Sequence, residues 1–199
     1  MLKKPLLFAI LVLLGGGLFA QSPKFGIKAG LNIANLKATA GGASATSPDI
    51  YSFHGGFYAI MMTSEKFGFQ PEFIYSGQGG GDDSGKFNMN YLNVPVMMRY
   101  DFAPGVNVQF GPQIGFLLSA TVNGQDAKSG FNSVDFGLGF GLGVDRPSGV
   151  TFGFRYVIGL SNTLSSATTS AASGLGIGGL TMTNQVIQLS IGMRLSKGE

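Results

Sequence analysis

The strongest constraint on the fold is an alternation of apolar residues with polar or small ones, repeated with a period of two. Such alternation is typical of β-strands, because successive side chains of a strand point to opposite faces of the sheet. The segment 53–62 is apolar on both faces, so its pattern gives it no orientation. The predicted strands, in which the alternation is clear except in the second, are residues 24–34, 53–62, 66–76, 90–102, 106–119, 133–144, 150–161 and 184–195.

The two faces of the seven clear segments differ sharply in charge. In segment 133–144, Phe136, Leu138 and Phe140 alternate with glycines, and in every clear segment the apolar face carries no charged residue. An Arg or Lys facing lipid near the bilayer midplane costs about 2–4 kcal/mol. A soluble barrel would have the reverse arrangement, with an apolar interior and a charged exterior. The pattern therefore predicts that the apolar face contacts lipid.

No membrane-spanning helix is expected after residue 20, because no uninterrupted apolar run there reaches 18 residues. A closed sheet is then the structure that pairs all backbone groups within lipid. Its interior would be packed, and the 33 glycines of the chain would leave room there for a few long polar side chains. We expect an all-β fold, an eight-stranded antiparallel up-and-down transmembrane β-barrel.

The connections between the predicted strands alternate in length. Long ones are expected at 35–52, 77–89, 120–132 and 162–183, and short ones at 63–65, 103–105 and 145–149. Outer-membrane barrels have short periplasmic turns and longer external loops. The alternating lengths of the connections therefore indicate a protein of the cell outer membrane.

The N-terminus has the order of a secretory signal peptide. Lys3 and Lys4 precede an apolar run from Leu6 to Phe19, and the small residue Ala20 follows. The run is shorter than the roughly 20 residues that a membrane-spanning helix needs. We expect a cleaved signal peptide at 1–20 that exports the chain through the inner membrane, and a barrel domain at 21–199. The chain has no cysteine, which excludes disulfides and thiol chemistry.

Three prolines, Pro71, Pro95 and Pro112, fall inside predicted strands. Proline cannot donate to a β-ladder and is usually confined to edges or bulges. Because their strands are neighbours, we expect one region of bulges there.

The polar face predicts a network inside the barrel. Unpaired buried charge is costly, so we expect Glu72 to pair with Arg155, Arg99 or Lys28 and to plug the lumen. The alternative is a narrow ion path. The predicted lumen network comprises Lys28, Gln70, Glu72, Asn93, Arg99, Gln109, Gln113, Asp135, Arg155, Gln188 and Arg194.

A second candidate site is centred on His54, the only histidine, predicted at the barrel rim. With Asp82 and Asp83 of the following long loop it could form a small hydrolase centre, provided that the groups lie within hydrogen-bond reach. The simpler interpretation is a polar rim residue beside a solvated acidic turn. Two adjacent carboxylates without an Asp-x-Asp spacing are a weak signal for a cation, so no metal and no cofactor is expected.

Tyrosines are expected at strand ends or on the outward face, as in the aromatic belt of membrane proteins, with core packing as the alternative. The residues concerned are Tyr75, Tyr91, Tyr100 and Tyr156.

Residues 25–32, 70–76, 91–96 and 111–115 carry a family resemblance, and the Gln-Pro-Glu and Leu-Asn-Val-Pro pieces within them are its most specific parts. The chain resembles the PorT-like family of small bacterial outer-membrane β-barrel proteins over nearly all of its length after the signal. The resemblance implies a barrel in the outer membrane, and the secretion role of the founding type is not transferred with it. One departure is that Leu195 stands near the end of the last strand, where many such chains have an aromatic residue.

These observations predict a non-enzymatic barrel with a structural or interaction role, exerted through its external loops or periplasmic turns. Outer-membrane lipid is the expected partner, with a protein partner at the loops or turns. The net charge of +3 includes no basic patch, so no nucleic acid is expected. We expect a monomer, and the alternatives are the small hydrolase and the narrow pore.

Overall fold

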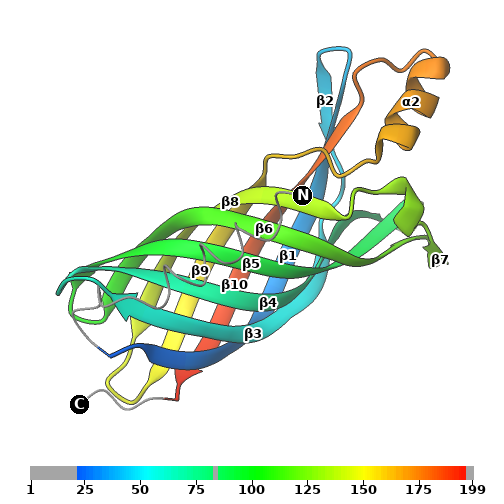
Figure 1. Cartoon of the computed structure of the whole chain (residues 1–199). Helices are drawn as coiled ribbons and strands as arrows, with labels where there is room; N and C mark the ends of the chain where they lie inside the picture. The colour runs from blue at the N-terminus through cyan, green and yellow to red at the C-terminus, as the bar shows by residue number, and fades with distance from the viewer. Residues whose placement is uncertain (1–21, 83–84, 196–199) are drawn as a thin grey trace, which may run out of the picture.

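The computed structural model describes residues 22–82 and 85–195, so the expected signal peptide lies outside the described residues. Long antiparallel strands dominate the fold (Figure 1). These strands are β1 (Lys24–Ala40), β3 (Ile50–Met62), β4 (Phe67–Asp82), β5 (Gly85–Ala103), β6 (Val106–Val122), β8 (Val134–Asp145), β9 (Val150–Gly159) and β10 (Thr181–Arg194).

The sheet closes on itself. Each long strand pairs antiparallel with its neighbour in the chain, and β1 pairs with β10 in an unbroken register from Gly26↔Arg194 to Thr39↔Thr181. The ring therefore contains eight strands and has no free edge around the barrel wall. The predicted eight-stranded up-and-down barrel is confirmed.

The apolar face of each strand points outward. Along β1, Phe25 and Leu31 are 55% and 62% exposed, whereas Asn32 is fully buried. The segment that the sequence pattern could not orient is β3, where Phe57 is 67% exposed and His54 only 1%. The large exposed side chains form an apolar outer wall, and the polar side chains fill the interior.

The connections differ at the two ends of the barrel. At the short-turn end, residues 63–66, 104–105 and 146–149 join the strands. The opposite, long-loop end carries the short strands β2 (Ala43–Thr46) and β7 (Gln125–Asp126), the 3-10 helix η1 (Lys128–Gly130) and the helix α2 (Ser166–Gly174). All three predicted short connections are present at one end of the barrel, and the predicted long connections 35–52, 120–132 and 162–183 lie at the other end, the first of them partly within β1 and β2.

One predicted loop is wrong. Residues 77–89 were expected to form a glycine-rich loop, but most of them extend the β4–β5 hairpin, from Gly77↔Asn90 to Asp82↔Gly85. Gly79 and Gly81 have φ values of 133° and 115°, and a side chain on Gly79 would collide with the carbonyl oxygen of Phe87. Glycine here permits close backbone pairing, and it is not the loop signal that its frequency suggests.

The long-loop end continues the barrel outward. β1 extends beyond the predicted end of its strand and pairs with β2 on one side and with β10 on the other, so three strands project from the barrel (Figure 1). α2 lies beside them, starts at the N-cap Ser165 and buries none of its residues. Within the described ranges, no helix is long and apolar enough to cross a membrane.

The prolines do not form bulges. The β3–β4 ladder is interrupted opposite Pro71 but resumes with the same register, and Pro95 and Pro112 pair with Gln113 and Leu138. Register shifts occur elsewhere, between β5 and β6. The expected bulge region is therefore wrong: each proline leaves out a hydrogen bond and keeps the register.

We predict that a charge on the outer wall will destabilise the barrel in a bilayer. Leu189 is 48% exposed and is paired with the apolar Leu31 and Phe154. Leu189→Arg should lower the free energy of unfolding by about 2–4 kcal/mol, measured by urea unfolding in lipid vesicles. Leu175→Arg is the control, since Leu175 is 83% exposed next to α2. Equal stability of both variants would contradict a lipid-facing wall.

Candidate functional site

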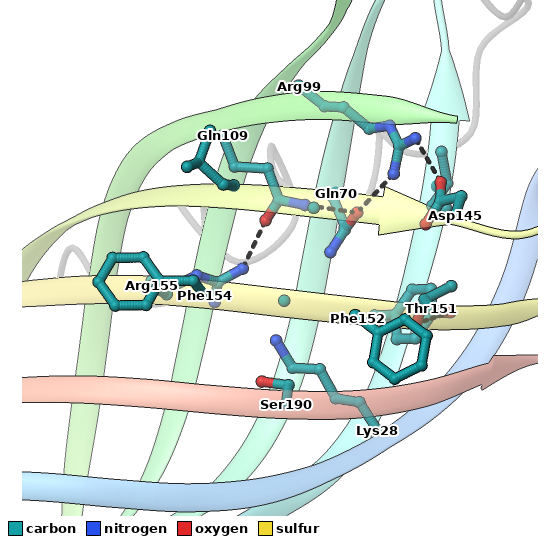
Figure 2. Close-up of a pocket in the computed structure, with 15 residues that line it drawn as sticks. Lys28, Gln70, Arg99, Gln109, Asp145, Thr151, Phe152, Phe154, Arg155 and Ser190 are labelled. Carbon is teal, nitrogen blue, oxygen red and sulfur yellow. Dashed lines mark hydrogen bonds and ion pairs between the residues drawn. The ribbon is translucent and has the colours of Figure 1, made fainter. Parts of the chain in front are cut away.

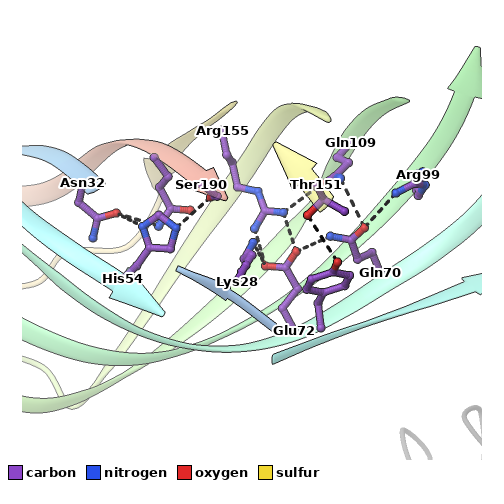
Figure 3. A network of polar contacts seen from close by, with 12 residues as sticks. Lys28, Asn32, His54, Gln70, Glu72, Arg99, Gln109, Thr151, Arg155 and Ser190 are labelled. Carbon is purple, nitrogen blue, oxygen red and sulfur yellow. Dashed lines mark hydrogen bonds and ion pairs between the residues drawn. The ribbon is translucent and has the colours of Figure 1, made fainter. Parts of the chain in front are cut away.

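The centre of the barrel interior is the carboxylate of Glu72 on β4, which is fully buried. Arg155 of β9 donates two parallel hydrogen bonds to it, Nη1 to Oε2 and Nη2 to Oε1, both 2.8 Å. Lys28 of β1 donates from Nζ to Oε2 at 2.6 Å. A bidentate arginine pair is among the stronger charge-assisted contacts, and here it joins opposite walls of the barrel (Figure 3).

Two glutamines connect this charged triad to the rest of the lumen. Gln70 donates from Nε2 to Oε1 of Glu72 at 2.7 Å, and Gln109 accepts from Nη2 of Arg155 at 2.7 Å. Nε2 of Gln109 in turn donates to Oδ1 of Asn107 at 2.9 Å. The amides thus supply further hydrogen bonds to the Glu72 carboxylate and to the Arg155 guanidinium, as buried polar groups require.

Arg99 forms a second charged cluster, nearer the short-turn end. Its Nε donates to Oδ1 of Asp101 at 2.7 Å, and its Nη2 donates to Oδ2 of Asp145 at 2.5 Å. The sequence offered Arg99 as one of three partners for Glu72, but in the structure it reaches only the intervening Gln70, at 3.4 Å. Both aspartates were missed because they sit at strand ends, where the alternation assigns no face.

His54 lies inside the barrel and not at the rim. Its Nδ1 contacts Oδ1 of Asn32 at 2.8 Å, and its Nε2 contacts Oγ of Ser190 at 2.9 Å. Since Asn32 Oδ1 can only accept, the proton belongs on Nδ1, and Ser190 donates to Nε2. Gln188 also donates to Asn32 Oδ1, at 3.3 Å. The histidine is therefore held on both sides by neutral partners.

The predicted rim site is not assembled. His54 pairs with Ser76 across β3 and β4, and Asp82 stands six residues further along β4. At about 3.3 Å per residue, this places the two residues roughly 20 Å apart along the strand. Asp82 is exposed, and Asp83 lies outside the described residues. General base catalysis needs hydrogen-bond reach, which His54 and Asp82 do not have.

A third polar group surrounds Asp135 on β8. Ser161 Oγ donates to its Oδ1, and Asn184 Nδ2 donates to its Oδ2 at 3.0 Å. Asn184 also contacts the hydroxyl of Tyr91 at 3.4 Å. Tyr91 is only 1% exposed, so its expected place in an outer aromatic belt is wrong.

The three remaining predicted lumen residues occupy two places. Asn93 and Gln113 point inward and are 1% and 8% exposed. Arg194 stands at the short-turn mouth, where its Nη2 donates to the carbonyl oxygen of Arg146 at 2.6 Å.

An apolar cluster closes the lumen at the long-loop end; we call it the outer cap. It holds Tyr91 and residues from loops that fold over the mouth, where Phe131 and Leu164 form an isolated β-bridge. The side chain of Asn132 fixes these loops by donating to the carbonyl oxygens of Asn162 and Leu164, at 2.9 and 2.8 Å. The buried members are Leu36, Met89, Tyr91, Leu117, Ala120, Phe131 and Leu164.

Two cavities interrupt the packing below the outer cap. The inner cavity measures about 40 Å³, and Lys28, Thr151 and Arg155 are among its lining residues (Figure 2). Tyr58 also lines it. A vestibule of about 410 Å³ opens at the short-turn end. The part of the chain that the structure describes holds no group of three or more His, Cys, Asp or Glu side chains that could bind a metal ion.

A closed barrel with an apolar exterior and a hydrogen-bonded ionic interior defines a membrane-spanning β-barrel protein. The family model described as "Outer membrane protein beta-barrel domain" matches residues 19–165. The chain therefore belongs to this family and is an integral protein of the outer membrane. No curated protein matches it in sequence.

Solved structures with a similar fold include Neisserial surface protein A, at 14% identity and a TM-score of 0.54, covering 88% of this chain and 100% of that one. Ail, the attachment invasion locus protein of Yersinia pestis, has 14% identity and a TM-score of 0.49 over 87% and 99% of the two chains. OprG from Pseudomonas aeruginosa has 16% identity and a TM-score of 0.43 over 88% and 97%. The first similarity supports the barrel fold alone.

We predict that Glu72→Gln will be strongly destabilising, because it leaves Arg155 and Lys28 buried without their common carboxylate. Breaking a buried ion pair from one side costs about 3–5 kcal/mol. Urea unfolding of the folded barrel measures the loss. Glu65→Gln, in an exposed short turn, is the matched control and should change stability by less than about 1 kcal/mol. If Glu72→Gln left the free energy of unfolding unchanged, the triad would not be the interaction that holds the lumen together.

Proposed function

We propose that this protein is a non-conducting, non-enzymatic outer-membrane barrel that acts through the surface of its long-loop end. The observation that carries the first part is the bidentate Glu72–Arg155 pair, which spans the lumen with Lys28 attached. Gln70 and Gln109 fill the space around it, and the outer cap lies above it. An ion crossing the barrel would have to break the triad and displace the cap.

The interaction role rests on elements that the barrel does not need for its own packing. α2 has no buried residue, and all four residues of β2 are exposed. Both elements project beyond the barrel on the same side (Figure 1). Structured segments that bury little of their own surface are typical of sites where loops on a rigid scaffold contact another molecule.

The absence of enzyme activity is part of the proposal. The histidine held between Asn32 and Ser190 has no carboxylate partner, and Asp82 stands at a different height. We also propose that residues 1–20 form the signal peptide, that the barrel is a monomer, and that it belongs with the PorT-like barrels. The motifs named for that resemblance are the support for the last assignment.

Conductance measurements test the closed lumen. The folded barrel, verified by its shift on SDS gels without boiling, should give no stepwise current in a planar lipid bilayer. Glu65→Gln, which changes only an exposed turn, should be equally silent. Stepwise currents from the folded wild-type protein would favour the narrow ion path.

Site-specific photo-crosslinking in intact cells tests the interaction surface. A photoreactive residue in place of Leu175, which is 83% exposed, should give a defined protein adduct. The same residue in place of Leu189 on the lipid-facing wall should give none. Adducts obtained only from the exposed turn residue Ser148 would instead place the partner at the periplasmic turns.

A further inference from the structure

The charges at the centre of the lumen are not balanced. Lys28 and Arg155 are two cations, and among the residues that the structure describes Glu72 is the only carboxylate bonded to them. Their side chains are 9%, 7% and 0% exposed, so little water reaches them. A net charge buried without compensation costs several kcal/mol. The triad therefore needs either a further anion or the loss of the proton from Lys28.

The cluster around Arg99 has the opposite excess, with two carboxylates on one cation. It lies at the vestibule, and the side chain of Asp101 is 29% exposed, so water shares its excess charge. Between the two clusters stand the neutral side chains of Gln70 and Gln109. Charge balance through these amides is weaker than balance by an ion in direct contact.

The inner cavity lies beside the excess positive charge. Its volume of about 40 Å³ is sufficient for a small ion or for one or two water molecules. Nζ of Lys28 donates one hydrogen bond, to Glu72, while an ammonium group has three N–H donors. The hydroxyls of Tyr58 and Thr151 line the same cavity and contact each other only weakly, at 3.5 Å. These groups can together surround an anion with hydrogen-bond donors.

We propose that the inner cavity binds one small inorganic anion, of the size of chloride, held by the ammonium of Lys28 and by the hydroxyls of Tyr58 and Thr151. The inner cavity and the vestibule share Arg99 and Asp145 in their walls, so the ion enters from the short-turn end. The bound anion neutralises the triad and leaves the lumen closed. The site is thus a structural ion site inside a non-conducting barrel.

Crystals of the folded wild-type barrel soaked in bromide give the direct test. An anomalous peak in the inner cavity, within hydrogen-bond distance of Lys28 Nζ, is expected. An empty cavity at saturating bromide would overturn the proposal. The experiment does not depend on the proposed interaction role, so its failure would leave that role unaffected.

Two solution measurements distinguish a bound anion from a Lys28 side chain that has lost its proton. In chloride, compared with gluconate at equal ionic strength, the thermal unfolding midpoint should rise by roughly 3 °C, because an ion bound only to the folded state stabilises it. ¹⁵N NMR of the lysine side chains should report Lys28 as an ammonium. A neutral amine at Lys28, together with equal unfolding midpoints in chloride and gluconate, would overturn the proposed anion site.

Three variants locate the effect. Lys28→Met removes the excess charge and should abolish the chloride dependence, whereas Lys66→Met, in an exposed turn, should retain it. Gly153→Ala keeps every charge and places a methyl group in the cavity wall, where its Cβ would meet the Cβ of Ser190 at an ordinary 3.6 Å. This variant should also lose the chloride response. An unchanged response in both Lys28→Met and Gly153→Ala would place the anion elsewhere.

Discussion

The pairing of the first strand with the last is the interaction on which the rest of the structure depends. In hydrocarbon no water satisfies backbone groups, so an open sheet edge there is untenable. The unbroken β1–β10 ladder removes both edges at once. Closure also creates the interior, because the polar faces of all eight strands then point at one another. The ionic network is a consequence of this geometry, because charged side chains enclosed together must pair.

Space decides how the interior is filled. Eight strands leave room only for side chains, so long polar residues must face small ones. Gly143 shows this directly: a Cβ there would lie 2.5 Å from Oδ1 of Asn107. Glycine opposite a long polar side chain therefore serves packing. The outer cap is apolar instead, since side chains from β1, β5 and β6 pack there against Phe131 and Leu164 from two loops.

The sequence predicted the barrel because the alternation of apolar and polar residues is a local pattern and recurs in each strand. The Glu72 pairs were also predictable, since a buried carboxylate on a polar face needs cations from that face. Asp101 and Asp145 were not predicted because they lie at strand ends. The inward position of His54 was not predicted because its strand is apolar on both faces. The outer cap depends on loops folding back, which no local pattern records. Tyr91 stands two residues before Asn93 on β5, so the alternation itself places both side chains on the inward face. The Gly77–Asp82 extension was missed because frequent glycine indicates a loop in most chains.

The triad joins side chains from β1, β4 and β9, so it forms only when nearly the whole chain has been assembled. Before closure, Lys28 and Glu72 belong to an unfinished sheet whose outer strands are open to pairing with other chains. Contacts between such distant segments form slowly, because bringing them together costs the conformational entropy of the chain between them. The ion pairs can therefore form only late in folding. A chain that stops before β9 lacks Arg155, which completes them.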